Sequence, residues 1–148
     1  MKKILIFTVL VFSLAVACDT AEKTPADVAS VMKDSSQFTT IQWLDSSIDF
    51  GTKKMGEVVN ITFKCKNTGN KPLYLFNVRP SCGCTLVDYS KDAIAPGKEG
   101  KIDAQFNTKG HPGVAHKTIT VIANTSNEAT NTLRFSGLVL PSDSTTKN

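Results

Sequence analysis

The sequence predicts an all-β protein: a β-sandwich of immunoglobulin size with seven or eight strands. Between about residues 38 and 140, apolar residues recur at every second position, and no stretch keeps a helical period beyond two turns. Turn-forming residues separate these runs at intervals of eight to twelve residues, which is typical of two packed antiparallel sheets. The 148 residues are 41% hydrophobic and 20% charged, as in globular proteins, and their number suits one domain.

The clearest strand is expected over Val59–Lys66. Its inward positions would be Val59, Ile61, Phe63 and Cys65, and its outward positions are polar or charged, with lysines among them. Such an outward face would serve either as a recognition surface or as protection against edge-to-edge aggregation. Further strands are expected at Leu73–Val78, Lys101–Phe106, Thr118–Ala123 and Thr132–Leu140, with shorter candidates at Ile41–Leu44, Ile48–Phe50 and Thr85–Tyr89.

Two of these runs depart from simple alternation. Leu73, Leu75 and Val78 cannot all face one side of a regular strand, so we expect a bulge or a strand that is buried on both faces. In the last run, a change of phase at Gly137 would turn Leu138 and Leu140 inward.

Three turns are predicted from their residues. Gly69, before Lys71-Pro72, is expected to supply a positive φ. Ala95-Pro96-Gly97-Lys98 has proline and glycine at the positions that a type II turn requires. The segment 112–115, between His111 and His116, is interpreted as a hairpin.

The N-terminus has the pattern of an export signal. A cationic head, Lys2-Lys3, precedes the 14-residue apolar run Ile4–Ala17, which is shorter than the roughly 20 residues of a membrane-spanning helix. We therefore interpret residues 1–17 as a signal peptide, followed by a flexible tether over residues 18–37 and a domain over residues 38–140. A short helix over residues 26–33 is the alternative within the tether, and residues 141–148 are expected to form a disordered tail.

The small residues before Cys18 resemble a bacterial lipobox, in which the cysteine is acylated and becomes the new N-terminus. Ala15 departs from that pattern, because leucine is usual three places before the cysteine and here stands at Leu14. Two or more acyl chains give stable membrane attachment, so we expect a lipid-anchored protein of the bacterial cell envelope, either periplasmic or surface-facing. The alternative is an ordinary secreted protein cleaved near Ala17, with Cys18 an incidental thiol.

Short motifs in a fixed order carry a family resemblance. They include Asp49-Phe50-Gly51, Phe63–Gly69, Ser81-Cys82-Gly83-Cys84-Thr85, Ile94-Ala95-Pro96-Gly97 and Phe106-Asn107. This set resembles the bacterial DUF1573 domain, one of the immunoglobulin-like modules related to the major-sperm-protein and ASPM/SPD-2/hydin domains. The resemblance implies a fold and an exported location, but no reaction.

Cys82-Gly83-Cys84 is the one constellation with potential chemistry, and three interpretations remain open. The two cysteines could form a disulfide, with Gly83 helping the backbone to bend. They could bind copper or zinc, with His111 or His116 as further ligands. They could also be reduced structural thiols. Cys65 is expected to be a small buried hydrophobic residue, with a bridge to Cys82 or Cys84 as the alternative.

Composition and motifs exclude several functions. The 17 basic and 13 acidic residues, with only two arginines, are too balanced and scattered for a nucleic-acid binder. The sequence has no nucleophile elbow, phosphate loop or paired carboxylates, so we expect no enzyme and no cofactor. The favoured function is an envelope binding or scaffolding module whose partner is a protein or a glycan. The alternative is a thiol redox or copper-handling protein that uses Cys82 and Cys84.

Overall fold

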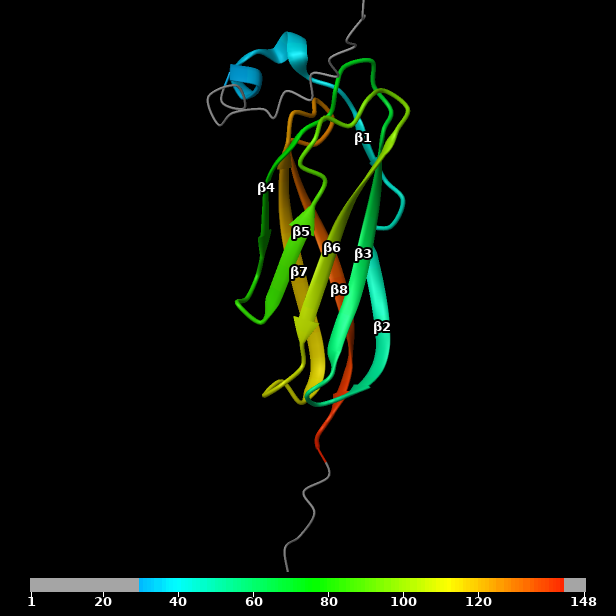
Figure 1. The fold of residues 1–148 in the computed structure, drawn as a ribbon, viewed down its shortest axis with the longest axis vertical. Helices are drawn as coiled ribbons and strands as arrows, with labels where there is room; N and C mark the ends of the chain where they lie inside the picture. Colours follow the sequence, from blue (N-terminus) through cyan, green and yellow to red (C-terminus); the bar gives the residue numbers. More distant parts are fainter. Residues whose placement is uncertain (1–29, 143–148) are drawn as a thin grey trace, which may run out of the picture.

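In the computed structural model, which describes residues 30–142, the domain is a sandwich of two four-stranded sheets (Figure 1). A 3-10 turn, η1 (Ser35–Gln37), precedes the strands. The strands are β1 (Ile41–Trp43), β2 (Ser47–Lys54), β3 (Val58–Asn67), β4 (Leu75–Pro80), β5 (Thr85–Tyr89), β6 (Glu99–Asn107), β7 (Gly113–Ala123) and β8 (Thr130–Leu140). The predicted all-β, immunoglobulin-like sandwich is confirmed, with eight strands in the described part of the chain.

One sheet has the order β1-β3-β6-β5 and the other the order β2-β8-β7-β4. Every pair is antiparallel except β2 with β8, which is parallel. The chain therefore changes sheet at every connection from β1 to β5 and again between β6 and β7, five times in the described residues. The change between β4 and β5 passes through residues 81–84, so Cys82 and Cys84 lie at one of the points where the chain crosses between the sheets.

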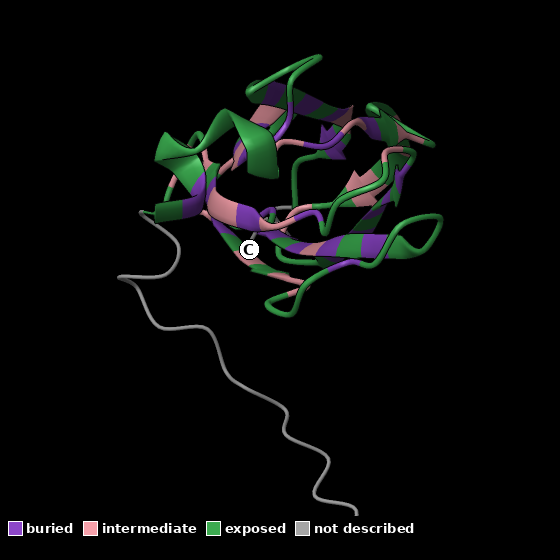
Figure 2. Cartoon of the chain, turned by 90° about the horizontal axis from the view of Figure 1, so that it is seen from above, coloured by how far each residue is buried: buried purple, intermediate pink, exposed green. Residues whose placement is uncertain are grey.

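Alternation places the core between the sheets. In β3, Val59, Ile61, Phe63 and Cys65 are all buried, as expected, and the residues between them are exposed. Figure 2 shows buried and exposed stretches alternating around the wall of the sandwich. Phe106 packs against Phe135 across the core, with ring centroids 5.8 Å apart. Burial of each such side chain contributes roughly 1.5–3 kcal/mol.

The expected change of phase in the last strand is wrong. Val139 is fully buried, whereas Leu138 and Leu140 are about 40% exposed, so the inward positions of β8 stay odd-numbered to its end. Gly137 occupies an inward position, where an added Cβ would lie 2.3 Å from the Phe50 ring. The glycine makes room for that ring and does not shift the strand.

The bulge expected near Leu75 is present. The register of β4 against β7 shifts between Leu75 and Asn77, which allows both Leu75 and Val78 to be buried. Leu73 lies before the strand and not in it. It is fully buried and forms an isolated bridge with Ile94.

The turn predictions have mixed outcomes. Gly97 has a φ of +76°, and Lys98 N donates to Ala95 O at 3.0 Å, as the type II turn requires. The positive φ expected at Gly69 is wrong. A Cβ there would lie 2.1 Å from Thr39 Oγ1 and 2.7 Å from Thr40 N, so Gly69 is needed for close chain approach.

The hairpin expected between His111 and His116 is also wrong. The chain turns earlier, at residues 108–112, where His111 N donates to Thr108 O at 3.0 Å and Gly110 has a φ of +77°. Gly113 is already the first residue of β7, and His116 lies within that strand. The two histidines therefore stand on a turn and on a strand, not on either side of one loop.

The residues expected to form the signal peptide, Cys18, most of the expected tether and residues 143–148 lie outside the described residues. At the end of the expected tether, residues 30–33 are helical and Val31 is buried. Within residues 30–142, no helix has the length and apolar character needed to cross a membrane.

Candidate functional site

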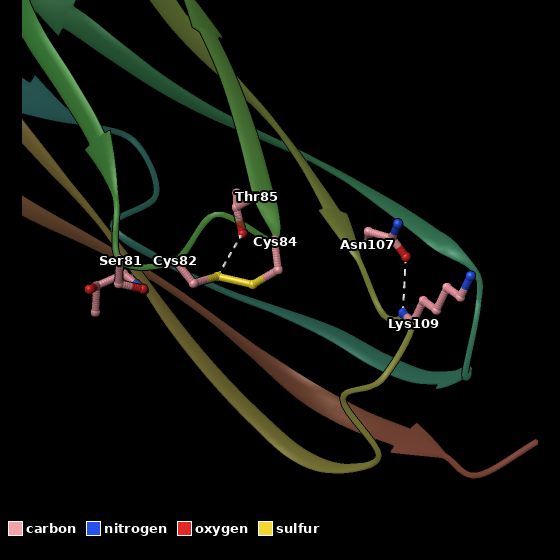
Figure 3. Close-up of a disulfide and its surroundings, with 7 residues drawn as sticks. Ser81, Cys82, Cys84, Thr85, Asn107 and Lys109 are labelled. Atoms are coloured by element: carbon pink, nitrogen blue, oxygen red, sulfur yellow. Dashed lines mark hydrogen bonds between the residues drawn. A yellow bond between two sulfur atoms is a disulfide. The ribbon is translucent and has the colours of Figure 1, made fainter.

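Cys82 and Cys84 are joined by a disulfide in the crossover between β4 and β5, with their Cα atoms 5.3 Å apart (Figure 3). This separation lies within the normal range for disulfides. The structure thus has one of the three arrangements that the sequence leaves open. Both cysteines are half-buried, and Gly83 between them is exposed.

Backbone hydrogen bonds attach this crossover to both sheets. Ser81 N donates to Thr118 O of β7 at 2.8 Å, and Thr118 N donates back to Ser81 Oγ at 3.1 Å. On the other side, Asn107 N of β6 donates to Cys84 O at 2.9 Å. The loop therefore has a defined position at both of its ends.

Gly83 does not have the role expected for it. Its φ is not positive, and an added Cβ would meet no atom within 4 Å. A side chain would therefore fit at this position, and the disulfide forms without the conformational freedom of glycine.

The two sulfur atoms have different surroundings. Cys82 Sγ lies 3.6 Å from Oγ1 of the buried Thr85. Because a disulfide sulfur carries no proton, the hydroxyl of Thr85 is the donor. Cys84 packs against the hydrophobic core on one side and lines a surface groove on the other.

The groove is a hollow of about 440 Å³ on the outer face of β3, β6 and β5. Val58 and Leu86, 56% and 70% exposed, give it an apolar character. The lining residues are Val58, Gly83, Cys84, Leu86, Gln105, Asn107 and Lys109. Figure 3 shows Asn107 and Lys109 at the end of β6, where Lys109 N donates to Asn107 Oδ1.

Sequence reasoning did not find Val58, Thr85 or Leu86 as site residues. Alternation in the expected strand Thr85–Tyr89 does carry a signal, because it places Thr85 inward and Leu86 outward. An outward leucine beside a cysteine pair marks an apolar surface. Only the pairing of β5 with β6 brings that surface next to Val58 and Lys109.

Cys65 is fully buried in β3, opposite Gly100, and is the free cysteine of the described residues. It forms no bridge to Cys82 or Cys84, so the expected small buried hydrophobic residue is what the structure shows. Burial raises the pKa of the Cys65 thiol to about 11. The thiol is therefore protonated and unreactive at neutral pH.

A metal site at the cysteine pair finds no geometric support. Over residues 30–142, no three His, Cys, Asp or Glu side chains are placed to share a metal ion. His111 packs against the Phe106 ring, with centroids 5.9 Å apart, and His116 is an exposed residue of β7. The histidines are therefore not brought to Cys82 and Cys84 as a ligand set.

The shifted pKa values among the described residues belong to groups outside the groove. Hydrogen bonds from Lys101 and Thr62 hold the pKa of Asp103 below its usual value. The hydrogen bond to Asp103 in turn raises the pKa of Lys101. Both side chains are on the solvent-facing side of the sheet, where ion pairs contribute little to stability. Neither residue lines the groove.

These features define a small immunoglobulin-like module with a disulfide-bonded cysteine loop between β4 and β5. The model of a family described as "Protein of unknown function (DUF1573)" matches residues 41–139. The chain therefore belongs to the DUF1573 family, which confirms the resemblance seen in the motifs. A comparison with curated protein sequences gives no significant match.

Solved structures with the same fold are distant in sequence. A protein of unknown function from Porphyromonas gingivalis W83 has a TM-score of 0.61 at 15% identity, over 71% of this chain and 49% of its own. The ASH/PapD-like domain 7 of human CEP192 has a TM-score of 0.55 at 16% identity, over 72% and 89%. The VesB protease of Vibrio cholerae has a TM-score of 0.56 at 15% identity, over 75% and 34%. This chain therefore spans about half of the first structure and a third of the protease.

Proposed function

We propose that this protein is a lipid-anchored binding or scaffolding module of the cell envelope, without catalytic activity. The observation that carries the proposal is the apolar groove beside the disulfide, on an otherwise polar outer face. Val58 and Leu86 are large apolar residues that the fold leaves open to solvent. Exposed apolar surface bordered by polar residues is typical of sites that bind a partner.

The fold supports a binding role. The structural match to the PapD-like domain of CEP192 extends over nearly the whole of that domain. Immunoglobulin-like sandwiches present loops at their ends and strand edges at their sides, and both are used for recognition. The similarity to VesB involves only a third of the protease and carries the fold alone.

The arrangement of the ends supports a tethered module. The described chain starts at the end of the sandwich where β3 finishes and β4 begins, whereas the β4–β5 crossover lies toward the opposite end (Figure 1). The 11 residues of β7 connect these two ends and span roughly 35 Å at about 3.3 Å per residue. A lipid on Cys18 would therefore leave the groove directed away from the point of attachment and open to an envelope protein or a glycan.

Lipid attachment is tested by mass spectrometry and membrane fractionation of the full chain produced in a bacterial host. We expect diacylglyceryl on Cys18 and recovery in the membrane fraction. Cys18→Ala should abolish the modification and release the protein from membranes. A wild-type N-terminus without fatty chains would contradict the anchor.

Partner binding is tested by placing a photo-crosslinking amino acid at position 86 in the exported full chain. We expect discrete crosslinked products in intact cells. The matched control is position 132, an exposed site on the outer face of the other sheet. Equal crosslinking at both positions, or none at position 86, would contradict a binding role for the groove.

A further inference from the structure

We propose that the Cys82–Cys84 disulfide accepts thiolates from a polypeptide seated on the groove, with Cys84 as the sulfur attacked and Cys82 as the leaving group. This goes beyond a binding role and does not depend on the lipid anchor. It rests on the different surroundings of the two sulfur atoms and on the residues that line the groove.

Contact with the groove distinguishes the two cysteines. Cys84 lines the groove, so a ligand lying there contacts that residue, whereas Cys82 is not part of the lining. Asn107 N also holds Cys84 O at 2.9 Å, which fixes the start of β5 at the groove wall. A nucleophile that arrives through the groove therefore meets Cys84 first.

The surroundings of Cys82 also favour it as the leaving group. Thiol–disulfide exchange is faster when the departing thiolate is stabilised. Cys82 Sγ already has the Thr85 hydroxyl as a donor at 3.6 Å. A charge that develops on Cys82 would strengthen this hydrogen bond, because donors bind anionic acceptors more strongly.

The groove is suited to a cysteine within a polypeptide that has apolar neighbours. Leu86 and Val58 offer apolar contacts on either side of β6. Lys109 adds a positive charge that attracts a thiolate. A small hydrophilic thiol such as glutathione would be attracted by the charge of Lys109 but would not make the apolar contacts. Loss of the apolar contacts should therefore slow a polypeptide thiol and not glutathione.

The exchange balances in two steps. The incoming thiolate forms a bond to Cys84 Sγ as the Cys82–Cys84 bond breaks, and the electron pair of that bond stays on Cys82 as a thiolate that takes a proton from water. A second thiolate of the same polypeptide then attacks the polypeptide's own sulfur in the mixed disulfide and releases Cys84 as a thiolate. The polypeptide loses two electrons and gains a disulfide, and Cys82 and Cys84 become a reduced pair.

The test uses the full chain, extracted in mild detergent, and a synthetic Leu-Cys-Leu heptapeptide with reduced glutathione as the comparison thiol. Early mixtures are quenched with N-ethylmaleimide, and tandem mass spectrometry locates the peptide adduct and the alkylated thiol. We expect the peptide on Cys84 and the maleimide on Cys82 in at least a tenfold excess over the reverse arrangement. An equal distribution, or an excess on Cys82, would overturn the assignment.

Single substitutions test separately the Thr85 hydroxyl, the apolar contact of Leu86 and the charge of Lys109. Thr85→Val should slow exchange with both thiols several-fold, and Thr85→Ser should restore it. Leu86→Ser should slow the peptide several-fold and leave glutathione unchanged. Lys109→Gln should slow both thiols at low salt, whereas Lys98→Gln, in the distant β5–β6 turn, should slow neither.

A structural role alone predicts a different pattern. A disulfide that only clamps the crossover would react equally slowly with both thiols and would not respond to Thr85→Val or Leu86→Ser. Circular dichroism and urea unfolding of each variant show whether a slower rate comes from a changed fold. A folded Thr85→Val or Leu86→Ser variant with wild-type exchange rates would overturn the proposal.

Discussion

The two ends of the sandwich are stabilised by different interactions. The asparagine end, where residues 68–74, 90–98 and 124–129 gather around the start of the described chain, is held by buried polar side chains. The disulfide end has turns at residues 55–57, 81–84 and 108–112 (Figure 1), and it carries the groove and the Cys82–Cys84 disulfide.

At the asparagine end, two fully buried amides bind the backbone of several loops. Asn124 Nδ2 donates to Gln37 O at 2.8 Å and to Pro72 O at 2.9 Å, and its Oδ1 accepts from Tyr74 N at 2.7 Å. Asn67 makes the same kind of contacts. Its Nδ2 donates to the carbonyl groups of residues 71 and 94, and its Oδ1 accepts from Thr39 Oγ1 at 2.8 Å.

The two ends differ in how well they tolerate amino-acid substitution. Loops at the asparagine end have their backbone groups satisfied by particular side chains, so substitution there leaves buried groups without partners. The disulfide loop is attached mainly through its backbone, with Ser81 Oγ as a side-chain acceptor. The neighbouring turns at residues 55–57 and 108–112 meet at the buried Thr108 hydroxyl, which contacts Gly56 N and Glu57 O. We therefore expect substitutions to cost less stability in the β4–β5 crossover than at the asparagine end or at Thr108.

The largest expected effect is that of Asn124→Ala. Removal of the amide breaks three part-buried hydrogen bonds to backbone groups, and each buried partner that is lost costs about 1–3 kcal/mol. We expect the free energy of unfolding, measured in urea, to fall by roughly 3 kcal/mol or more. Asn107→Ala, which removes an exposed bond to Lys109 N at the disulfide end, should cost less than about 1 kcal/mol. Equal losses would contradict the difference between the ends.

The next effect is a loss of stability at alkaline pH from Cys65. Its pKa is about 11 in the folded protein, against 9.0 for an unperturbed thiol. The folded state thus holds the proton where the unfolded state releases it, so stability is full below pH 9 and falls by roughly 2–3 kcal/mol as the pH rises to 11.

Urea unfolding at pH 8 to 11 measures this loss. Cys65→Ala, which has no thiol at this position, should lose less stability over the same range, whatever its stability at pH 8. An identical pH slope in the wild-type protein and the variant would exclude Cys65 as the cause.

A matched pair of glycine substitutions tests the two ends directly. Gly69→Ala places a Cβ against Thr39 Oγ1 and Thr40 N, and overpacking of this kind costs about 1–3 kcal/mol. Gly83→Ala meets open space and should change stability by less than about 0.5 kcal/mol. Thermal unfolding of both variants gives the comparison, and it fails if Gly83→Ala is the more damaging.

The smallest effect is expected from reduction of the disulfide. Loop-closure entropy for a bridge between residues two apart amounts to roughly 1.5 kcal/mol. The reduced protein should therefore stay folded, with a slightly lower urea midpoint. The Cys82→Ser/Cys84→Ser double variant should behave in the same way. Loss of the fold on reduction would show that the bridge is an essential clamp.

Much of the fold could be predicted from the sequence, because alternation is a local signal. The inward residues of β3, β6 and the second half of β7 were predicted correctly, as were the bulge near Leu75 and the turn at Gly97. The errors at Gly69 and Gly137 have one cause. Each glycine was interpreted through its own backbone, whereas its neighbour across the fold decides its role.

Only the cysteines of the candidate site could be predicted from the sequence. Cys82 and Cys84 stand out by their spacing, but the sequence leaves their bonding open. Thr85, Val58 and Lys109 become part of the site through strand pairing, since they come from β5, β3 and the β6–β7 turn. Residues so far apart in the chain give no local pattern.

The sequence by itself determined that this is an all-β sandwich, since period-two burial and turn chemistry depend on residues close together in the chain. Only the tertiary structure decided which cysteines pair and what each sulfur contacts. It also decided which apolar residues stay exposed and which glycines make room for another segment. These properties depend on contacts between distant strands, and such contacts exist only once the two sheets have packed.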